Sequence, residues 1–203
     1  MTRPFAHRII FVRHGQTVFN AENRLQGQRD VPLDGKGRDQ ARAIGRYLRV
    51  AMNSDIAAME SAGAFWASPL IRARETMELI RVAMGRSPQP YQLDARLKEL
   101  TFGAWEGLTW PEVSTTDPDG TRAREADKWN FTPPDGESYA MLAERVRPWL
   151  EELTSEALVV AHGGVARAFY ALIAGMAEGE AASVPIWQGR ALIFERGEAR
   201  WVG

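Results

Sequence analysis

The stretch RIIFVRHG, residues 8–15, decides the fold that we expect for this chain. Its four consecutive apolar residues, IIFV, show no helical period, which is typical of a strand buried on both faces of a sheet. The apolar run stops at the pair His14-Gly15. A second apolar run, Ala157–Ala161, stops in the same way at His162-Gly163. The sequence therefore predicts two buried strands whose carboxyl ends are each followed by a histidine.

Segments with helical period lie between the predicted strands. Asp34 is expected to cap a helix with one buried stripe, made of Ala41, Ile44, Leu48 and Ala51. The helical period returns over residues 142–153 and again over 165–175. Strands that alternate with helices predict an α/β fold, a three-layer sandwich with a mostly parallel central sheet flanked by helices on both faces. In such sheets, ligands bind beyond the carboxyl ends of the strands.

A further strand, Ala64–Ala67, is followed directly by Ser68-Pro69. Serine is a common helix cap and proline is common at the first helical position, so we expect a helix to begin there. Arg72 then lies in the first turn, where a cation opposes the helix dipole. An arginine becomes favourable in that place if a phosphate binds at the helix end, because free backbone N–H groups and the guanidinium then hold the same anion.

The composition is that of one ordinary soluble domain, which we place at residues 1–203. The chain is 45% hydrophobic and 25% charged, with 25 basic and 26 acidic residues. This balance does not indicate a nucleic acid or a membrane surface as the partner. There is no cysteine, no apolar run long enough for a signal peptide and none long enough to span a membrane. We expect a cytoplasmic protein.

Residues 100–137 are rich in glycine, proline, tryptophan and charge. We expect them to form a cap of loops and one or two short helices over the carboxyl edge of the sheet. Trp105, Trp110 and Trp129 are expected to pack this cap onto the domain, although they could instead line a pocket. At the end of the chain, residues 191–195 and 199–202 are expected to form a hairpin that turns at residues 196–198.

Several classes of chemistry have no motif in this sequence. Without cysteine there is no thiolate chemistry, and there is no His-Glu-x-x-His and no close set of acidic residues that would indicate a metal. A Walker loop and a Gly-x-Ser-x-Gly elbow are also missing. We therefore expect neither a metal nor a cofactor.

Two of the three histidines, His14 and His162, share the same setting at a strand end, whereas His7 lies outside it. One such residue could simply cap a turn, but two in the same setting indicate a site. Arg13 ends the same strand and is expected to point to the same edge. Glu99 has apolar neighbours, so partial desolvation would favour its protonated form and suit a general acid, although a surface ion pair is the ordinary role of such a residue.

As a set, these residues resemble the motifs of the histidine phosphatase superfamily, which includes the cofactor-dependent phosphoglycerate mutases. The first motif corresponds to Arg13-His14-Gly15-Gln16-Thr17 with Asn20, and the second to Ser68–Thr76. Leu97–Leu100 and His162-Gly163 resemble the third and fourth. The four motifs appear in the family's order and cover nearly the whole chain.

The resemblance implies a phosphoglycerate mutase-like fold and a role for each matching residue. His14 would attack phosphorus and form a phosphohistidine, and Glu99 would act as general acid and base. Arg13, Arg72 and His162 would bind the phosphoryl oxygens, His162 as a donor if it is protonated. The residues implied to contact the substrate are Gly15, Thr17, Asn20, Gln26, Gly27 and Gly163.

The same resemblance favours a phosphatase acting on a small phosphorylated metabolite. Residues 102–110 and 134–138 are similar to the phosphatase branch, especially to alpha-ribazole phosphatases and broad-specificity members. Mutases have an arginine-rich insertion after the acid-base glutamate and an asparagine after the second His-Gly, where this chain has Gly164. Mutase activity on a phosphoglycerate and a non-catalytic phosphate-binding module remain the alternatives. A homodimer is common in the superfamily, so a partner copy is possible.

Overall fold

The computed structural model describes residue 5 and residues 7–203, and it places six strands in one sheet in the order β3-β2-β4-β1-β5-β6. The neighbouring pairs within β3-β2-β4-β1 are parallel, and β5 and β6 are added antiparallel. The prediction of a mostly parallel sheet is therefore confirmed. The strand bounds are β1 Ile9–Arg13, β2 Phe65–Ala67, β3 Gln92–Leu93, β4 Ala157–Ala161, β5 Ala191–Glu195 and β6 Glu198–Val202.

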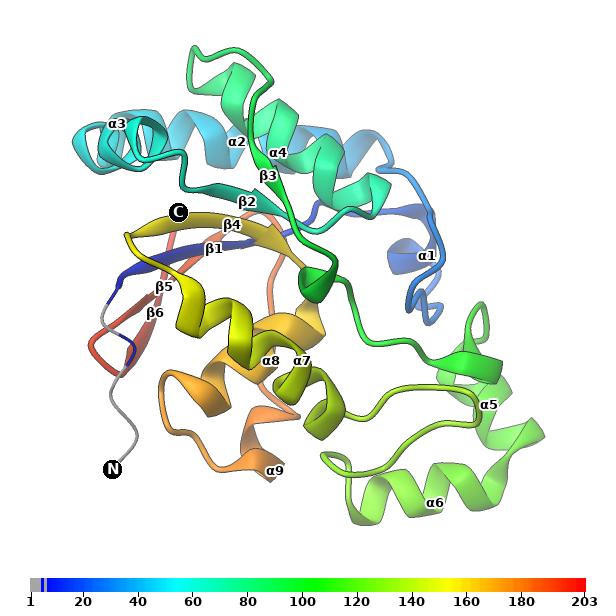
Figure 1. Cartoon of the computed structure of the whole chain (residues 1–203). Helices are drawn as coiled ribbons and strands as arrows, with labels where there is room; N and C mark the ends of the chain where they lie inside the picture. The colour runs from blue at the N-terminus through cyan, green and yellow to red at the C-terminus, as the bar shows by residue number, and fades with distance from the viewer. Residues whose placement is uncertain (1–4, 6) are drawn as a thin grey trace.

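Helices cover both faces of the sheet, as Figure 1 shows. One layer contains α2 (Gly35–Ala51), α3 (Asn53–Ser61) and α4 (Ile71–Ala83). The opposite layer contains α7 (Tyr139–Glu152), α8 (Gly163–Leu172) and α9 (Glu178–Ala181). The predicted three-layer sandwich is confirmed. No helix in the described part of the chain is long and apolar enough to cross a membrane.

The register between β1 and β4 brings the two histidines together. Arg13 lies opposite Ala161 in this parallel pair, and the backbone N–H of His14 donates to the carbonyl of Ala161 at 3.0 Å. His14 and His162 therefore leave the sheet side by side at its carboxyl edge. The strands that carry them are fixed by burial, because every residue of β4 is buried and so are all but the last of β1.

Three helices begin at places other than those predicted, and one of them, α7, begins at Tyr139, three residues earlier than expected. The N–H of Ser68 still donates to Val160 at 3.0 Å, so the chain continues along the sheet there, and α4 begins only at Ile71 with Leu70 as its N-cap. Conversely, α8 begins at Gly163 and ends at Leu172, because the chain turns into the helix directly after His162. Ala51 is exposed, since it is the last residue of α2 and the chain turns away there.

Three short helices were not predicted. The helix α3 has almost no amphipathic period, so its sequence gave no sign of it, and α1 (Val18–Ala21) and α9 are single turns. The C-terminal hairpin turns over two residues, Arg196 and Gly197, so that β6 begins one residue earlier than expected, at Glu198.

The segment 100–137 contains η2 (Gly103–Trp105), α5 (Trp110–Thr116) and α6 (Pro118–Ala126). The helices α5 and α6 lie beyond the end of the sheet, on the same side of the molecule as α1 (Figure 1). Trp105 is buried in a small separate core with Leu25 and Val113, and Trp129 is buried in the main core. These two tryptophans therefore pack the segment onto the domain, as expected, while Trp110 is half-buried beneath the guanidinium of Arg124.

The close contact between α2 and α4 leads to a stability prediction. A methyl group on Gly45 would lie 2.6 Å from the carbonyl oxygen of Ile80 and 2.7 Å from the Ala83 methyl. Glycine to alanine within a helix normally stabilises by about 0.5–1 kcal/mol. We expect Gly45→Ala to lower the free energy of unfolding instead, by about 1–3 kcal/mol, because it overpacks this contact.

Urea denaturation measures the difference, with Gly35→Ala on the same helix as the matched control. A methyl group on Gly35 would meet nothing within 4 Å, so that variant should be no less stable than the wild type. A Gly45→Ala protein as stable as Gly35→Ala would show that α2 and α4 do not pack this closely.

Candidate active site

The imidazole of His14 is buried, and its two nitrogens have different partners. Its Nδ1 lies 2.8 Å from the carbonyl oxygen of Gly15, and its Nε2 lies 3.3 Å from Nε of Arg72. A guanidinium can only donate, so we assign the ring proton to Nδ1 and leave a lone pair on Nε2. The ring is therefore held with Nδ1 protonated and Nε2 unprotonated, the state that attack through Nε2 requires.

The surroundings of His14 keep it neutral. Burial lowers the pKa of His14 well below its usual value, and the positive charges of Arg72 and Arg13 lower it further. The hydrogen bond to Gly15 acts in the opposite direction but is weaker. A neutral imidazole is the form that can attack phosphorus, since protonation removes its lone pair.

His162 lies beside His14, with the ring centroids 5.1 Å apart. Its Nε2 is 2.7 Å from Oγ of Ser68, and its buried Nδ1 has no hydrogen-bond partner among the described residues. Burial lowers the pKa of His162 well below its usual value, and the charges of Arg72 and Arg13 lower it further. The protein by itself therefore favours the neutral ring, and a phosphoryl group beside it would raise its pKa.

The guanidinium of Arg72 is fixed by three hydrogen bonds. Nη1 donates to the carbonyl of Arg29 at 2.7 Å, Nη2 donates to the carbonyl of Gly27 at 2.8 Å, and Nε donates to His14. Arg72 is only 1% exposed, and burial lowers its pKa to about 10. It remains charged at neutral pH, and each Nη still carries a second N–H that could bind an anion.

Arg13 ends β1 next to His14, as the sequence predicted. Its Nη1 donates to the carbonyl of Ile186 at 2.7 Å, whereas its buried Nε has no partner among the residues that the structure describes. Burial lowers the pKa of Arg13. A buried N–H without an acceptor is unfavourable, and an anion at this place would remove that penalty.

The carboxylate of Glu99 accepts hydrogen bonds from backbone N–H groups, so its surroundings are not purely apolar. The N–H of Gly164, in the first turn of α8, is 3.1 Å from both carboxylate oxygens, and the N–H of Leu100 is 3.1 Å from one of them. A methyl group on Gly164 would collide with Oε1 of Glu99 and lie 2.5 Å from Leu100. The carboxylate thus occupies the place that any side chain at position 164 would need.

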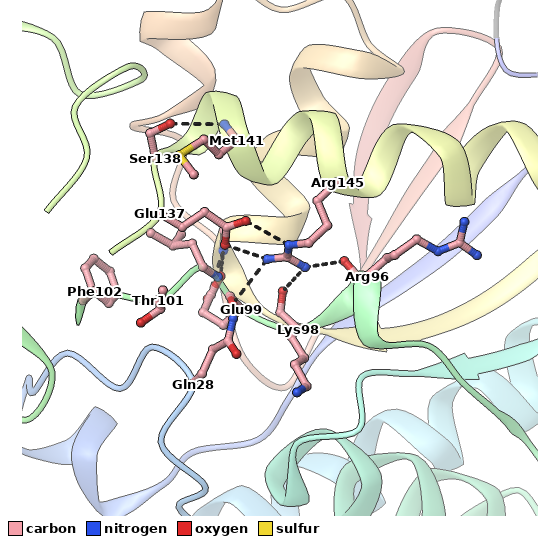
Figure 2. Close-up of polar contacts among 12 residues, drawn as sticks. Gln28, Arg96, Lys98, Glu99, Thr101, Phe102, Glu137, Ser138, Met141 and Arg145 are labelled. Atoms are coloured by element: carbon pink, nitrogen blue, oxygen red, sulfur yellow. Dashed lines mark hydrogen bonds and ion pairs between the residues drawn. The ribbon is translucent and has the colours of Figure 1, made fainter. Parts of the chain in front are cut away.

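The loop that carries Glu99 is held by Arg145, a residue that the sequence analysis missed. Figure 2 shows Arg145 reaching from α7 to this loop. Nη1 donates to the carbonyls of Arg96 and Lys98 at 2.6 and 3.2 Å, and Nε and Nη2 bind the two carboxylate oxygens of Glu137 at 2.9 and 2.7 Å. Nothing in the sequence around Arg145 distinguishes it from Arg147, the surface arginine of the same helix.

The carbonyl of Glu99 itself accepts from Nε2 of Gln28 at 3.1 Å, and Nη2 of Arg145 lies 3.5 Å from it (Figure 2). Gln28 is the residue after the predicted pair Gln26-Gly27. The loop is therefore tied both to α7 and to the segment between α1 and α2.

The other predicted site residues lie around His14, but several of their polar groups are used within the protein. Thr17 and Asn20 form a capping box at α1, and Asn20 also accepts from Nε2 of Gln188 at 3.0 Å. The N–H of Gly15 donates to Thr76, and Gly163 faces the Arg13 guanidinium. Gln26 is buried, and its Oε1 has no partner among the described residues.

Gln188 was not predicted as a site residue, although its side chain contacts both His14 and Asn20. Its Nε2 donates to the carbonyl of His14 at 3.1 Å in addition to Asn20. The segment that carries Gln188 directly precedes β5, and the pairing of β5 with β1 brings this segment next to the histidines. In the described part of the chain, no group of three or more His, Asp or Glu side chains is arranged to hold a metal.

The fold and this site define an α/β protein with imidazole and guanidinium groups clustered at the carboxyl edge of its sheet. The family model "Histidine phosphatase superfamily (branch 1)" matches residues 9–202. The chain belongs to this superfamily.

The names of individual relatives describe two activities, that of a phosphatase and that of a phosphoglycerate mutase. A glucosyl-3-phosphoglycerate phosphatase of Mycolicibacterium vanbaalenii is 35% identical over 182 residues, which cover 83% of this chain and 75% of that protein. A 2,3-bisphosphoglycerate-dependent phosphoglycerate mutase of Gloeobacter violaceus is 35% identical over 79% of this chain and 72% of its own length. A mycobacterial glucosyl-3-phosphoglycerate phosphatase solved with VO3 has a TM-score of 0.77 at 27% identity and 97% coverage of both chains.

Because His14 and His162 are buried and neutral, the free energy of unfolding should depend on pH. In the unfolded chain a histidine titrates near about pH 6.5, whereas the folded protein binds the proton only at lower pH. Below pH 6.5 the unfolded state therefore binds more protons, and the free energy of unfolding falls as the pH is lowered, by up to about 1.4 kcal/mol per pH unit for each histidine.

Chemical denaturation between pH 7.5 and 5 measures this slope. His14→Asn should make this slope shallower than in the wild type. If His14→Asn and the wild type had the same slope, the pKa of His14 would not be lowered in the folded protein.

Proposed function

We propose that this protein hydrolyses a phosphomonoester of a small metabolite through a phosphohistidine intermediate on His14. The observation that carries the proposal is the neutral His14 ring, whose Nε2 lone pair lies beside the Arg72 guanidinium and the His162 ring. A nucleophile next to fixed cations suits attack on a phosphoryl group, whose negative charge would otherwise repel it.

In the first step, Nε2 of His14 attacks phosphorus in line with the ester oxygen. The N–P bond forms while the P–O bond to the leaving group breaks, and protonated Glu99 gives its proton to the leaving oxygen. Arg13, Arg72 and His162 bind the phosphoryl oxygens and balance their charge in the transition state.

In the second step, water attacks the phosphohistidine and Glu99 takes its proton. The N–P bond breaks, His14 returns to its neutral form and inorganic phosphate leaves. The backbone N–H groups of Leu100 and Gly164 hold the carboxylate in place for this step. Both steps use only side chains of this protein, the substrate and water, so the proposal needs no metal and no cofactor.

Relatives with mutase names make isomerisation of a phosphoglycerate the second candidate. The position of Gly164 supports hydrolysis instead. The asparagine that mutases carry after their second His-Gly would have to occupy the space of the Glu99 carboxylate here. Two of the relatives described above are named as phosphatases, which also supports hydrolysis.

The direct test uses p-nitrophenyl phosphate between pH 5 and 8 without added metal. We expect turnover by the wild type and a loss of at least about 1,000-fold in His14→Ala, because a covalent route without its nucleophile has no first step. A folded wild type without turnover would contradict phosphatase activity, and a loss of only a few-fold would contradict the role of His14.

Trapping the intermediate separates the remaining alternatives. Acid-labile, base-stable labelling of the wild type by a phosphorylated substrate, absent from His14→Ala, would support the phosphohistidine. A non-catalytic phosphate-binding module would bind phosphate without labelling. A mutase would convert 3-phosphoglycerate to 2-phosphoglycerate when primed with the bisphosphorylated glycerate, whereas a phosphatase would release inorganic phosphate.

Arg145 provides a test of the role proposed for Glu99. Arg145→Gln removes the hydrogen bonds that hold the Glu99 loop, so we expect kcat to fall by about 10–100-fold with little change in KM. The loss should be larger for an alkyl phosphate than for p-nitrophenyl phosphate, because a poor leaving group depends more on the general acid.

The matched control is Arg147→Gln on the same helix. Arg147 pairs at the surface with Glu144, so this variant should keep the wild-type kinetics. Equal losses on both substrates in Arg145→Gln would indicate that Arg145 only stabilises the fold and does not position Glu99.

A further inference from the structure

The carboxylate of Glu106, just after η2, lies between the two segments that carry the proposed catalytic groups. Its side chain is only 12% exposed, and its Oε1 is the acceptor of three hydrogen bonds. The donors are the backbone N–H of Gln28 at 2.9 Å, the hydroxyl of Thr101 at 2.7 Å and the backbone N–H of Phe102 at 3.2 Å. One oxygen atom therefore joins the segment between α1 and α2 to the segment that follows Glu99.

The first of these segments fixes Arg72. The guanidinium of Arg72 donates to the carbonyls of Gly27 and Arg29, and Gln28, whose backbone is bound to Glu106, lies between them. A methyl group on Gly27 would collide with Oε1 of Glu106, so the carboxylate packs directly against the backbone that holds Arg72. Burial lowers the pKa of Arg72 most strongly, and the negative charge of Glu106 is one of the effects that raise it.

The second segment carries Glu99. Thr101 and Phe102, which follow Glu99 closely in the chain, both donate to Glu106. The backbone carbonyl of Glu99 accepts from the side chain of Gln28, the residue whose own N–H is bound to Glu106 (Figure 2). The acid-base carboxylate and the phosphoryl-binding guanidinium are thus held through contacts with the same side chain.

Hydrogen bonds rather than an ion pair keep Glu106 in this place. Its closest cationic partner is Nε of Arg29, which lies 3.8 Å from Oε2 on a side chain that is 53% exposed. An exposed pair of this length contributes little. A largely buried carboxylate is unfavourable unless hydrogen bonds satisfy it, so the three donors stabilise Glu106 and are themselves held in position by it.

We propose that Glu106 is a positioning residue for the reaction: it holds the segment that fixes Arg72 and the segment that carries Glu99 in one fixed arrangement. Its role is to set the place of the acid-base group relative to the bound phosphoryl group, and it transfers no proton itself. This role rests on the proposed function, because it takes Arg72 as a phosphoryl ligand and Glu99 as the general acid and base.

Glu106→Ala removes the shared acceptor and should have two separate effects. We expect kcat for p-nitrophenyl phosphate to fall by about 10–100-fold, and kcat for an alkyl phosphate to fall further, because Glu99 is displaced. The Kd of inorganic phosphate, measured by calorimetry, should rise by about 5–10-fold because Arg72 is displaced as well. Arg145→Gln, which loosens the Glu99 loop alone, should leave this Kd unchanged.

The conservative variant separates hydrogen bonding from other effects. Glu106→Gln keeps an amide oxygen that can take the place of Oε1, so kcat and the phosphate Kd should return to within about threefold of the wild type. If Glu106→Gln lost as much as Glu106→Ala, positioning through these hydrogen bonds would be overturned.

The matched control for a loss of stability is Glu60→Ala. Glu60 is a carboxylate of α3 that binds Arg81 and Arg86, so its removal breaks a comparable network elsewhere in the fold. This variant should keep the wild-type kcat on both substrates and the wild-type phosphate Kd. A Glu106→Ala protein that behaved like Glu60→Ala, or that lost activity equally on both substrates with an unchanged phosphate Kd, would overturn the positioning role.

Thr101→Val tests the same contact if Glu106→Ala does not fold. It removes the hydroxyl that binds Glu106 and releases only the Glu99 side of the arrangement. We therefore expect a larger loss of kcat on the alkyl phosphate than on p-nitrophenyl phosphate, with an unchanged phosphate Kd. Wild-type kinetics in Thr101→Val would overturn the positioning role in that case.

Phosphate binding distinguishes a failure of this role from a failure of the proposed function. If the wild type hydrolyses neither substrate but binds inorganic phosphate, a higher Kd in Glu106→Ala that is reversed in Glu106→Gln would still support the link to Arg72. Equal Kd values in the wild type and Glu106→Ala would overturn that link independently of catalysis. A wild type that neither hydrolyses these substrates nor binds phosphate would overturn both proposals.

Discussion

The parallel pairing of β1 with β4 is the constraint on which the site depends. Because Arg13 lies opposite Ala161, the residues that follow both strands leave the sheet at the same level. Consecutive residues of both strands are buried, so a shift of one residue in this register would disturb close packing against the helices on both faces of the sheet. The proximity of His14 and His162 is thus a consequence of packing that takes place several residues away.

This edge of the sheet concentrates positive charge in a buried place. Arg13 and Arg72 are kept inside the protein mainly by hydrogen bonds to backbone carbonyls, which stabilise a guanidinium without neutralising it. Their charges and the burial itself hold both imidazoles neutral. The positive charge of the two arginines therefore favours the binding of an anion. Together with burial, it also keeps the proposed nucleophile, His14, unprotonated. Glu99 adds a negative charge that acts on both arginines, and backbone N–H groups of Leu100 and Gly164 hold its carboxylate.

Much of this arrangement could be predicted from the chain, and the errors have physical causes. The apolar runs before His14 and His162 located β1 and β4, since a buried strand has an unmistakable composition. The helix after Ser68 was placed too early, because the serine remains tied to the neighbouring strand and contacts His162 instead of capping α4. Arg145 and Gln188 were missed, because each acts through partners distant in sequence.

The sequence by itself determined the α/β fold, the two strand-end histidines and the membership in the superfamily, because burial patterns and short motifs are local properties of the chain. Only the tertiary structure decided which nitrogen of His14 carries the ring proton, what holds Glu99 and which carbonyl groups hold the two buried arginines. Those properties depend on distances between segments that come together through the sheet register and the packing of residues 100–137, and no local pattern encodes them.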